Sequence, residues 1–582
     1  MEKIKLKIND KEYSVNKDAT ILEACREAAI EIPTLCYMKD IEPFGSCRIC
    51  LVEVKGMRTL IASCAYPVSE GMEIYTNTKH VHETRKLTLE LMLSDHNKDC
   101  LSCIRNQNCD LQKMCMDFGV EQENHYVGKM SDSTLDDSSA SIVRDNSKCI
   151  MCRRCVAACA DVQEISVIGP NDRGFATNIG CAFDVSLSNV PCIECGQCIV
   201  VCPVGALYEK DDTAAVWEAL NDPTKHVAVC AAPSIRVTLG ECFGDEPGTF
   251  VEGKMVAALK ALGFDGVYDM NLTADLTVVE EGKELIERIH NGGKLPMITS
   301  CSPGWVKYCE LYFPEFIPNL SSCKSPQQMF GALYKTRYAK KLGLKPKDIF
   351  FVSVIPCTAK KFELTRDGQS AVGKGIRDVD AAITTRELGR MIAKAGLNWN
   401  LLQDAKFDAI GGYGSGAGVI FGTTGGVMEA SLRTAAESIL GKVLKKVDYC
   451  DVRGPDGIKY AQYKLGDLTV KVAVASGTAN AKKLLNSIKA GETDVDFIEI
   501  MACPGGCICG GGQPVQSITT QNFTNLWEKR ANGLYSDDEK KVIRKAHDNP
   551  IILDIYEDYL GRPGSDLAHK VLHTTYEKRE QY

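Results

Sequence analysis

A glycine-rich run late in the chain decides how the rest of the sequence is interpreted: Met501-Ala-Cys-Pro-Gly-Gly-Cys-Ile-Cys-Gly-Gly-Gly-Gln-Pro514. Cys503 and Cys507 are four residues apart, and a third thiol lies at Cys509. The five glycines let main-chain atoms approach a bulky ligand closely. Thiolates are the soft ligands that iron–sulfur clusters select. The run therefore indicates cluster binding, although glycine-rich cysteine loops also occur at zinc sites.

The composition predicts a multidomain metalloprotein. A chain of 582 residues with 45% hydrophobic content is too long for one core, so roughly three to five domains are expected. A net charge of −8 makes nucleic acid an improbable partner. The start of the chain lacks the apolar core of a signal peptide, and no run of about 18 apolar residues predicts a membrane span. The 28 cysteines cluster at short spacings, which favours metal ligation in a reducing cytoplasm over disulfides.

Residues 1–80 predict a β-grasp ferredoxin-like domain. Lys3–Ile8 alternates as a half-buried strand does, and 12–15 can form its hairpin partner after a turn at Asn9-Asp10. Residues 20–28 have helical spacing, which makes Cys25 a core residue. The remaining cysteines resemble the ligands of a [2Fe–2S] cluster. These are Cys36, Cys47, Cys50 and Cys64.

Residues 81–125 begin with a predicted helix at 81–92 and continue with one histidine and three cysteines. Their spacing resembles the module that holds a [4Fe–4S] cluster with a His/Cys3 ligand set, although zinc accepts the same donors. The four residues are His96, Cys100, Cys103 and Cys109.

Residues 126–209 contain a polar stretch at 126–145, interpreted as a linker, and then a duplicated motif of the bacterial two-[4Fe–4S] ferredoxin type. In that pattern the fourth cysteine of each run binds the other cluster. One predicted ligand set is Cys149, Cys152, Cys155 and Cys202. The other is Cys192, Cys195, Cys198 and Cys159.

Residues 210–582 predict a large, two-lobed α/β catalytic domain. Strand-like apolar runs at 227–232, 349–355 and 470–476 alternate with helical segments, as in parallel sheets. Together with the preceding segments, this gives a multidomain chain of α+β and α/β classes.

Three signatures in this last segment resemble those of the iron-only, or [FeFe], hydrogenases, of the modular clostridial type with four accessory clusters. They are Thr299-Ser-Cys-Ser-Pro-Gly-Trp305, Pro356-Cys357-x2-Lys360-x2-Glu363, and the run 501–514. The resemblance implies an H-cluster, a [4Fe–4S] cubane joined to a two-iron subsite with CO, CN⁻ and a bridging dithiolate amine. It also implies three accessory [4Fe–4S] clusters and one [2Fe–2S] cluster.

The resemblance assigns roles to individual residues. Cys357 and Cys503 would hold the cubane, and Cys507 would bridge it to the two-iron unit. Lys360 and Ser234 would donate hydrogen bonds to the cyanides. The remaining assignments near the two irons are Met501, Gln327 and the pocket-shaping glycine segments 411–418 and 422–426, for which ordinary turns are the alternative.

A proton relay is also implied, running from Cys301 through Glu281 and Ser321 to Glu284. Glu281 and Glu284 are three residues apart and would share one face of a helix. A solvated acidic face is the other interpretation of that spacing.

One position departs from the family pattern. The family has two adjacent cysteines, of which the first carries protons and the second binds the cubane, whereas this chain has Cys301-Ser302. Ser302 as an alkoxide, Cys301, or a nearby thiol at Cys323 or Cys509 could provide the fourth ligand.

The resemblance implies an enzyme that interconverts protons and H2 in an anaerobic cytoplasm. Ferredoxin or a similar carrier would exchange electrons with it, and maturation proteins would deliver the two-iron subsite. The rival hypotheses are a slow or sensory hydrogenase and a non-catalytic iron–sulfur electron carrier.

Overall fold

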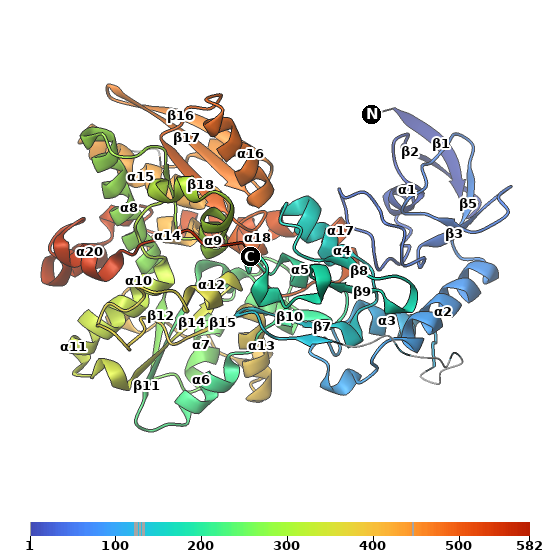
Figure 1. Ribbon diagram of the computed structural model, residues 1–582, viewed down its shortest axis with the longest axis horizontal. Coiled ribbons are helices and arrows are strands. Elements are labelled where there is room, and N and C mark those ends of the chain that lie inside the picture. The colour runs from blue at the N-terminus through green and yellow to red at the C-terminus, as the bar shows by residue number, and fades with distance from the viewer. Residues whose placement is uncertain (1, 122–125, 127–129, 131–133, 445–446, 582) are drawn as a thin grey trace. The chain divides into compact units, whose positions relative to one another are not determined.

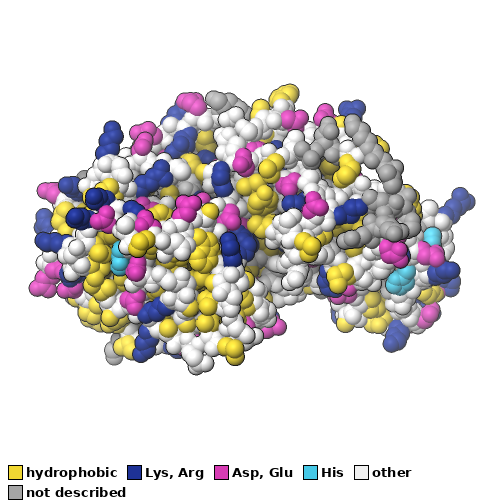
Figure 2. Space-filling model, turned by 90° about the horizontal axis from the view of Figure 1, so that it is seen from below, with side chains coloured by type: hydrophobic (Ala, Val, Ile, Leu, Met, Phe, Trp, Pro, Cys, Tyr) yellow, Lys and Arg dark blue, Asp and Glu magenta, His cyan; other side chains and the backbone are white. Residues whose placement is uncertain are grey.

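The computed structural model describes residues 2–121, 126, 130, 134–444 and 447–581 (Figure 1). The chain divides into two compact units. Unit 1 comprises Met1–Val190, Val201–Tyr208 and Val515–Thr524, and unit 2 comprises Pro191–Val200, Glu209–Pro514 and Asn525–Tyr582. Within the described parts of the chain, no helix is both long and apolar enough to cross a membrane. On the face drawn in Figure 2, basic and acidic side chains are interspersed.

Unit 1 begins with a five-stranded sheet in the order β2-β1-β5-β3-β4. The predicted hairpin is confirmed, because β1 pairs antiparallel with β2 and the turn residues Asn9 and Asp10 have φ values of 48° and 66°. Parallel pairing of β1 with β5 gives the expected β-grasp arrangement. The bounds are β1 (Lys3–Ile8), β2 (Lys11–Asn16), β3 (Leu51–Val54), β4 (Ile61–Ala62) and β5 (Glu73–Tyr75).

Helix α1 (Ile21–Glu27) packs on this sheet. It begins at a capping box in which the Thr20 hydroxyl accepts from the Glu23 N–H and the Glu23 carboxylate accepts from the Thr20 N–H. Cys25 lies on its inner face and is fully buried, as predicted for a core residue. Burial raises the pKa of the Cys25 thiol to about 12, as expected for a packing residue that stays protonated.

The rest of unit 1 consists of short elements around cysteine-bearing loops. The predicted helix at 81–92 is confirmed as part of α2. The bounds are α2 (Lys79–Ser94), α3 (Asp110–Asp117), β6 (Leu135–Asp136), β7 (Ile142–Asp145), α4 (Arg154–Ala157), β8 (Gly169–Asn171), β9 (Asn178–Gly180) and α17 (Ile518–Phe523).

The linker interpretation of 126–145 is wrong for its second half, while 127–129 and 131–133 lie outside the described residues. β6 and β7 form an antiparallel pair. The Asp136 carboxylate accepts hydrogen bonds from the Ser138 hydroxyl and from the Leu187 N–H, at 2.6 and 2.8 Å. Polar side chains therefore hold this segment in place through local bonds, which composition alone does not reveal.

Unit 2 is built on two sheets, one in each lobe (Figure 1). The first has the order β12-β11-β14-β15 and is entirely parallel. The second has the order β13-β18-β17-β16, with only the β16–β17 hairpin antiparallel. The bounds are β11 (His226–Ala231), β12 (Gly266–Asp269), β13 (Met297–Ile298), β14 (Ile349–Ile355), β15 (Ala381–Thr384), β16 (Ile458–Leu465), β17 (Leu468–Ser476) and β18 (Phe497–Met501).

The three predicted strands at 227–232, 349–355 and 470–476 correspond to β11, β14 and the greater part of β17. Their β-branched, apolar side chains are buried, as in a sheet covered on both faces. The helices around the candidate site are α8 (Asn271–Asn291), α9 (Pro303–Tyr312), α10 (Pro326–Leu333), α12 (Ala359–Glu363), α14 (Gly416–Ile420), α15 (Gly426–Leu440) and α18 (Leu526–Lys540).

Candidate active site and cluster-binding cysteines

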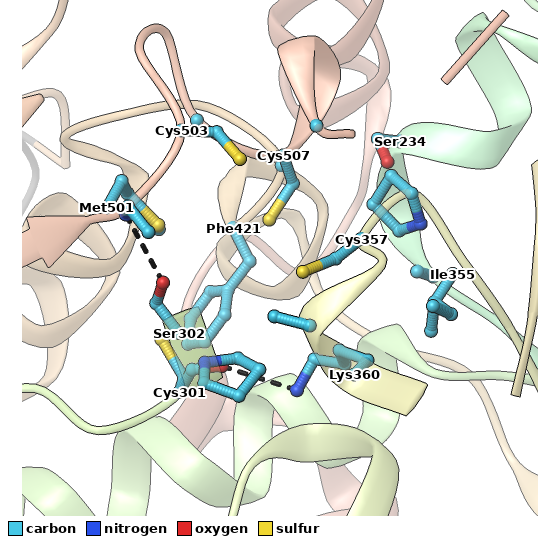
Figure 3. A pocket seen from close by; sticks show the side chains of 18 of the residues that line it. Ser234, Cys301, Ser302, Ile355, Cys357, Lys360, Phe421, Met501, Cys503 and Cys507 are labelled. Atoms are coloured by element: carbon cyan, nitrogen blue, oxygen red, sulfur yellow. Dashed lines mark hydrogen bonds between the residues drawn. The ribbon is translucent and has the colours of Figure 1, made fainter. Parts of the chain in front are cut away.

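A largely apolar cavity in unit 2 collects residues from the carboxyl ends of four parallel strands (Figure 3). Ser234 follows β11, Cys357 follows β14, Cys503 follows β18, and Cys301 follows β13. Ligand sites of open α/β sheets form at this edge because the connecting loops diverge there. Both lobes thus contribute to one site.

The thiols of Cys357, Cys503 and Cys507 enter this cavity, which Cys301 and Cys195 also line. Burial raises the pKa of each, and for Cys507 to about 12, with the neighbouring Cys357 adding to the effect. Three thiolates cannot be buried together without a compensating cation. The donor set therefore fits an iron–sulfur cluster, whose ferric and ferrous ions would provide that charge.

The glycines of the 501–514 run allow the backbone to surround this site. Gly506 has a φ of 87°, and a Cβ on it would lie 2.5 Å from the Thr424 nitrogen. A Cβ on Gly510 would lie 2.4 Å from the Pro356 carbonyl oxygen. Gly510 thus lets the Cys507 loop pack against the loop that carries Cys357, and Gly506 lets it pack against the 422–426 segment, which explains why the run is rich in glycine.

Lys360 lies at the end of α12 nearest the cavity and its ammonium group faces the interior (Figure 3). The Nζ atom donates to the Cys301 carbonyl at 3.3 Å and contacts the Glu363 carboxylate at 3.2 Å. Ser234 also lines the cavity, and its oxygen accepts from Gln513 Nε2 at 3.2 Å, a bond that does not use the hydroxyl proton. Both side chains can therefore donate toward an anionic ligand.

Gln327 is not among the residues that line the cavity. Its amide nitrogen donates to Glu363 at 2.6 Å, and its oxygen accepts from the Ser353 hydroxyl at 2.8 Å. Through Glu363 it orients the Lys360–Glu363 pair, and its place near the diatomic ligands stays a prediction. Met501 does line the cavity, as does Gly422 of the 422–426 segment.

The 411–418 glycine segment packs elsewhere. A Cβ on Gly414 or Gly418 would lie 2.2 Å from the Asn271 Cβ or 2.4 Å from its carbonyl oxygen. Gly414 and Gly418 therefore permit close packing on the start of α8, and Gly418 lies within helix α14 and not in a turn.

The adjacent residues Cys301 and Ser302 have different neighbours. Cys301 packs beside the apolar cluster that includes Ala274, Val278 and Phe421, on the side of α8. Burial raises the pKa of its thiol, and Glu281 is the next largest cause. The Ser302 hydroxyl accepts a hydrogen bond from the Ala502 N–H at 3.3 Å, beside Cys503.

The other two candidate thiols are not brought to the cavity. Cys323 is fully buried, and the negative charges of Glu284 and Glu281 add to the rise in its pKa. Cys509 lies beside the Arg530 guanidinium, which partly offsets the effect of burial on its pKa. Neither residue lines the space that Cys357, Cys503 and Cys507 enter.

The predicted relay residues lie on and beside α8. Glu281 is fully buried, and among the described residues neither of its carboxyl oxygens has a hydrogen-bond partner. Burial and the charge of Glu284 raise the pKa of Glu281 to about 8. Ser321 donates to the Glu284 carboxylate at 3.1 Å, and Arg288 pairs with the same carboxylate. A solvated acidic face is therefore excluded for Glu281.

In unit 1, the four cysteines predicted for the [2Fe–2S] cluster are buried together. Cys36 lies within hydrogen-bonding range of Cys47 and Cys64, and Cys50 within range of Cys64. The first ferredoxin-type set also lines one small cavity, with Ile179 and Val204 beside it. That set is Cys149, Cys152, Cys155 and Cys202.

In the His/Cys3 region, a further thiol shares a cavity with three of the four predicted ligands, and the ligand set stays a prediction. His96, Cys100, Cys109 and Cys115 line one cavity, whereas Cys103 is not among its lining residues. His96 Nδ1 is buried without a partner among the described residues, as a nitrogen that awaits a metal would be. Cys115 lies on α3, six residues after Cys109 in the sequence.

The remaining ferredoxin-type cysteines approach the main cavity from within unit 2. Cys195 lines the cavity, and its carbonyl oxygen lies 3.8 Å from the Cys503 Sγ. A Cβ on Gly511 would lie 2.3 Å from that carbonyl oxygen. The loop of Cys192, Cys195 and Cys198 is thus packed against the cysteine run 503–507, while the pairing of this loop with Cys159 stays a prediction.

Family models match four segments of the chain. The iron only hydrogenase large subunit, C-terminal domain, matches residues 225–511, and the iron hydrogenase small subunit matches 524–579. A 2Fe-2S iron-sulfur cluster binding domain matches 1–79, and the NADH-ubiquinone oxidoreductase-G iron-sulfur binding region matches 85–124.

Known proteins align over most of the chain. The NADP-reducing hydrogenase subunit HndD of Solidesulfovibrio fructosivorans is 47% identical over 100% of both chains. Iron hydrogenase 1 of Clostridium pasteurianum is 41% identical, over 98% of this chain and 99% of that protein. The structure of an apo [FeFe]-hydrogenase variant from Chlamydomonas reinhardtii matches with 42% identity and a TM-score of 0.55, over 62% of this chain and 98% of that one.

The fold and the thiol-lined cavity thus define an iron–sulfur oxidoreductase. The chain belongs to the iron-only, or [FeFe], hydrogenase family. It has the family's modular arrangement, with 2Fe-2S and 4Fe-4S domains in addition to the hydrogenase domain.

Proposed function

We propose that this chain catalyses the reversible reduction of protons to H2 at an H-cluster held in the unit 2 cavity. The observation that carries the proposal is the donor set of Cys357, Cys503 and Cys507, with Lys360 facing the same space. When bound, the H-cluster supplies the two-iron site at which H2 forms or is split and the cubane that exchanges electrons. The protein orients this group and tunes its potential.

The cavity residues would hold and polarise the group. Cys357 and Cys503 would bind the cubane, and Cys507 would bind both metal units. Lys360 and Ser234 would donate hydrogen bonds to cyanide nitrogens, since both present donors to an otherwise apolar space. Met501 would exclude water from the two-iron side, and Gln327 would position Lys360 through Glu363.

Proton transfer would start at the Cys301 thiol. Glu281 is the nearest carboxyl group to influence that thiol, and it has two unpartnered oxygens with which to accept a proton. Ser321 and Glu284 would continue the path, because the Ser321 hydroxyl already donates to Glu284. Arg288 holds the Glu284 carboxylate in place at the far end.

The Cys301→Ala variant is expected to keep its iron content and infrared bands while H2 turnover falls about 10²–10⁴-fold, the usual contribution of a positioned acid or base. An alanine cannot exchange a proton. Cys309→Ala, a buried thiol of α9 outside the cavity, is the matched control and should keep its turnover. Loss of the cubane from Cys301→Ala would instead assign Cys301 as a ligand.

Electrons would reach the cubane through the loop of Cys192, Cys195 and Cys198, since the Cys195 carbonyl lies against Cys503. The N-terminal domains would exchange electrons with ferredoxin or a similar carrier. The HndD relative is named as NADP-reducing, which makes a nicotinamide-linked partner the second candidate. Reduced thiols on this scale suit an anaerobic cytoplasm, where maturation proteins would insert the two-iron unit.

The proposed cofactors predict the iron content. One [2Fe–2S] cluster, three accessory [4Fe–4S] clusters and an H-cluster of six irons contain 2 + 12 + 6 = 20 irons per chain, counted from the ligand sets in the sequence. Iron and acid-labile sulfide analysis of fully matured protein checks this number. A plateau about four irons lower, with H2 turnover intact, would remove one accessory cluster from the proposal.

Infrared spectroscopy of matured protein under H2 and CO, combined with an H2 assay, tests the function itself. CO and CN⁻ bands that respond to H2, with turnover, support a hydrogenase. The same bands with little turnover would indicate a sensor, and their absence would leave an electron carrier.

A further inference from the structure

One corner of the thiol-lined cavity is occupied by a hydroxyl group. The loops after β14 and β18 bring in Cys357, Cys503 and Cys507, and the segment after β13 brings in Cys301 and Ser302. A cubane has four irons that each need an outer ligand. Cys357, Cys503 and Cys507 therefore leave one iron for the segment after β13, which offers the Cys301 thiol and the Ser302 hydroxyl.

Ser302 occupies the N-cap position of α9, yet it does not cap the helix. Serine at this position ordinarily accepts a hydrogen bond from a backbone N–H in the first helical turn. Here no such bond exists, and the following Pro303 has no N–H to give. The side chain is instead turned toward the segment that carries Cys503 (Figure 3).

The Ser302 oxygen is held in that orientation by one bond. The Ala502 N–H donates to it at 3.3 Å, and Ala502 directly precedes Cys503. Backbone N–H groups are the usual hydrogen-bond donors to an anionic ligand atom in a buried site. This bond would stabilise a deprotonated oxygen bound to iron.

The alternative thiols are placed less well. Cys301 packs against the α8 side of the cavity with Val278 and Phe421. Cys323 and Cys509 do not line the cavity. Cys301 also lines the cavity, but the Ser302 oxygen is the one bonded to the residue next to Cys503, so Ser302 is the better placed of the two.

We infer that Ser302 binds the fourth iron of the cubane as an alkoxide, so that the cluster is held by three sulfur atoms and one oxygen from the protein. The inference rests on the proposed function. Binding forms one iron–oxygen bond and breaks the hydroxyl O–H bond, the proton passes to water, and no electron is transferred. Oxygen is a harder donor than sulfur and favours ferric iron, so the substitution lowers the reduction potential of the cubane.

The test compares full-length matured protein with Ser302→Cys and Ser302→Ala. Ser302→Cys restores a fourth sulfur ligand and should raise the midpoint potential of the cubane, followed by infrared-monitored redox titration, with unchanged iron content. Its CO and CN⁻ bands should shift as well, because Cys507 would bind both metal units and so couple the cubane to the two-iron site. Ser302→Ala should lose about one iron per chain or open that corner to an added thiol.

Ser300→Ala is the matched control, since it removes a hydroxyl from the same segment that bonds to the Cys323 carbonyl and not to the cavity. It should reproduce the wild-type potential and bands. Unchanged potentials and bands in both Ser302 variants would overturn the inference, as would loss of the cubane from Cys301→Ala.

Failure of the proposed function would be seen separately. If wild-type matured protein gives no CO or CN⁻ bands, the cubane is followed in the same variants by electron paramagnetic resonance of the reduced protein, as a difference from wild type. A shifted cubane signal in Ser302→Cys would still support the oxygen ligand, and an identical signal would reject it.

Discussion

Replacing Cys507 by serine is expected to abolish H2 turnover while the clusters of unit 1 remain. Cys507 enters the cavity between Cys503 and Cys357 (Figure 3), and its loop is fixed by the glycines at 506 and 510. In the proposed site its sulfur binds two metal units at once. A hydroxyl oxygen is smaller and harder than sulfur, so it cannot span both units. The two-iron unit should therefore be lost.

This result would not conflict with an oxygen ligand at Ser302. A terminal ligand binds one iron, and its bond length can be accommodated by a small movement of the side chain. A bridging ligand must satisfy two distances together, and the Cys507 backbone cannot move because Gly506 and Gly510 are in contact with other loops. An oxygen ligand in place of sulfur is thus tolerated at position 302 and not at position 507.

The measurement for Cys507→Ser is an H2 assay with infrared and electron paramagnetic resonance spectra. Cys509→Ser is the matched control, because that thiol lies two residues away beside Arg530 and outside the cavity. It should keep the CO and CN⁻ bands and most of the turnover. Turnover in Cys507→Ser would show that Cys507 is not the bridging ligand.

The parts of the fold that depend on local patterns could be predicted from the sequence. The alternation of polar and apolar residues predicted β1, and apolar runs predicted β11 and β14. This works because the pattern of buried residues in a strand involves only a few neighbouring positions. Cysteine spacing gave the set of Cys149, Cys152, Cys155 and Cys202 that shares one cavity, since metal ligands must lie at fixed short spacings.

Other features depend on contacts between distant segments and could not be predicted. Gln327 bonds to Glu363 and Ser353, which come from a helix and a strand that follow it in the chain. Glycines 411–418 are needed for packing on α8. The place of Cys115 beside His96 depends on how α3 folds back on its loop.

The protonation of Glu281 also depends on contacts between distant segments. The sequence gives an acidic helix segment, for which a solvated face is the ordinary interpretation. The fold instead buries the Glu281 carboxyl group without a hydrogen-bond partner among the described residues, and this raises its pKa to about 8. At neutral pH the group is therefore mainly protonated and can both receive and release a proton.

The Glu281→Gln variant is expected to assemble all clusters and to lose about 10²–10⁴-fold in H2 turnover, as for other positioned acids and bases. Glutamine has nearly the same shape, but it cannot exchange a proton. Glu287→Gln is the matched control on the same helix, since Glu287 is half-exposed and paired with Lys283. It should keep its turnover. Equal turnover in both variants would remove Glu281 from the relay.

The same variant should change how stability depends on pH. The folded protein keeps the Glu281 proton up to a pH of about 8, whereas an unfolded chain releases it near the ordinary carboxyl pKa of 4.5. Between these values the unfolded state binds fewer protons, so this residue lowers the stability of wild-type protein as the pH rises. Glu281→Gln removes this fall in stability with rising pH. Its melting temperature should match wild type at about pH 5 and exceed it at about pH 8, and a constant difference across this range would contradict the raised pKa.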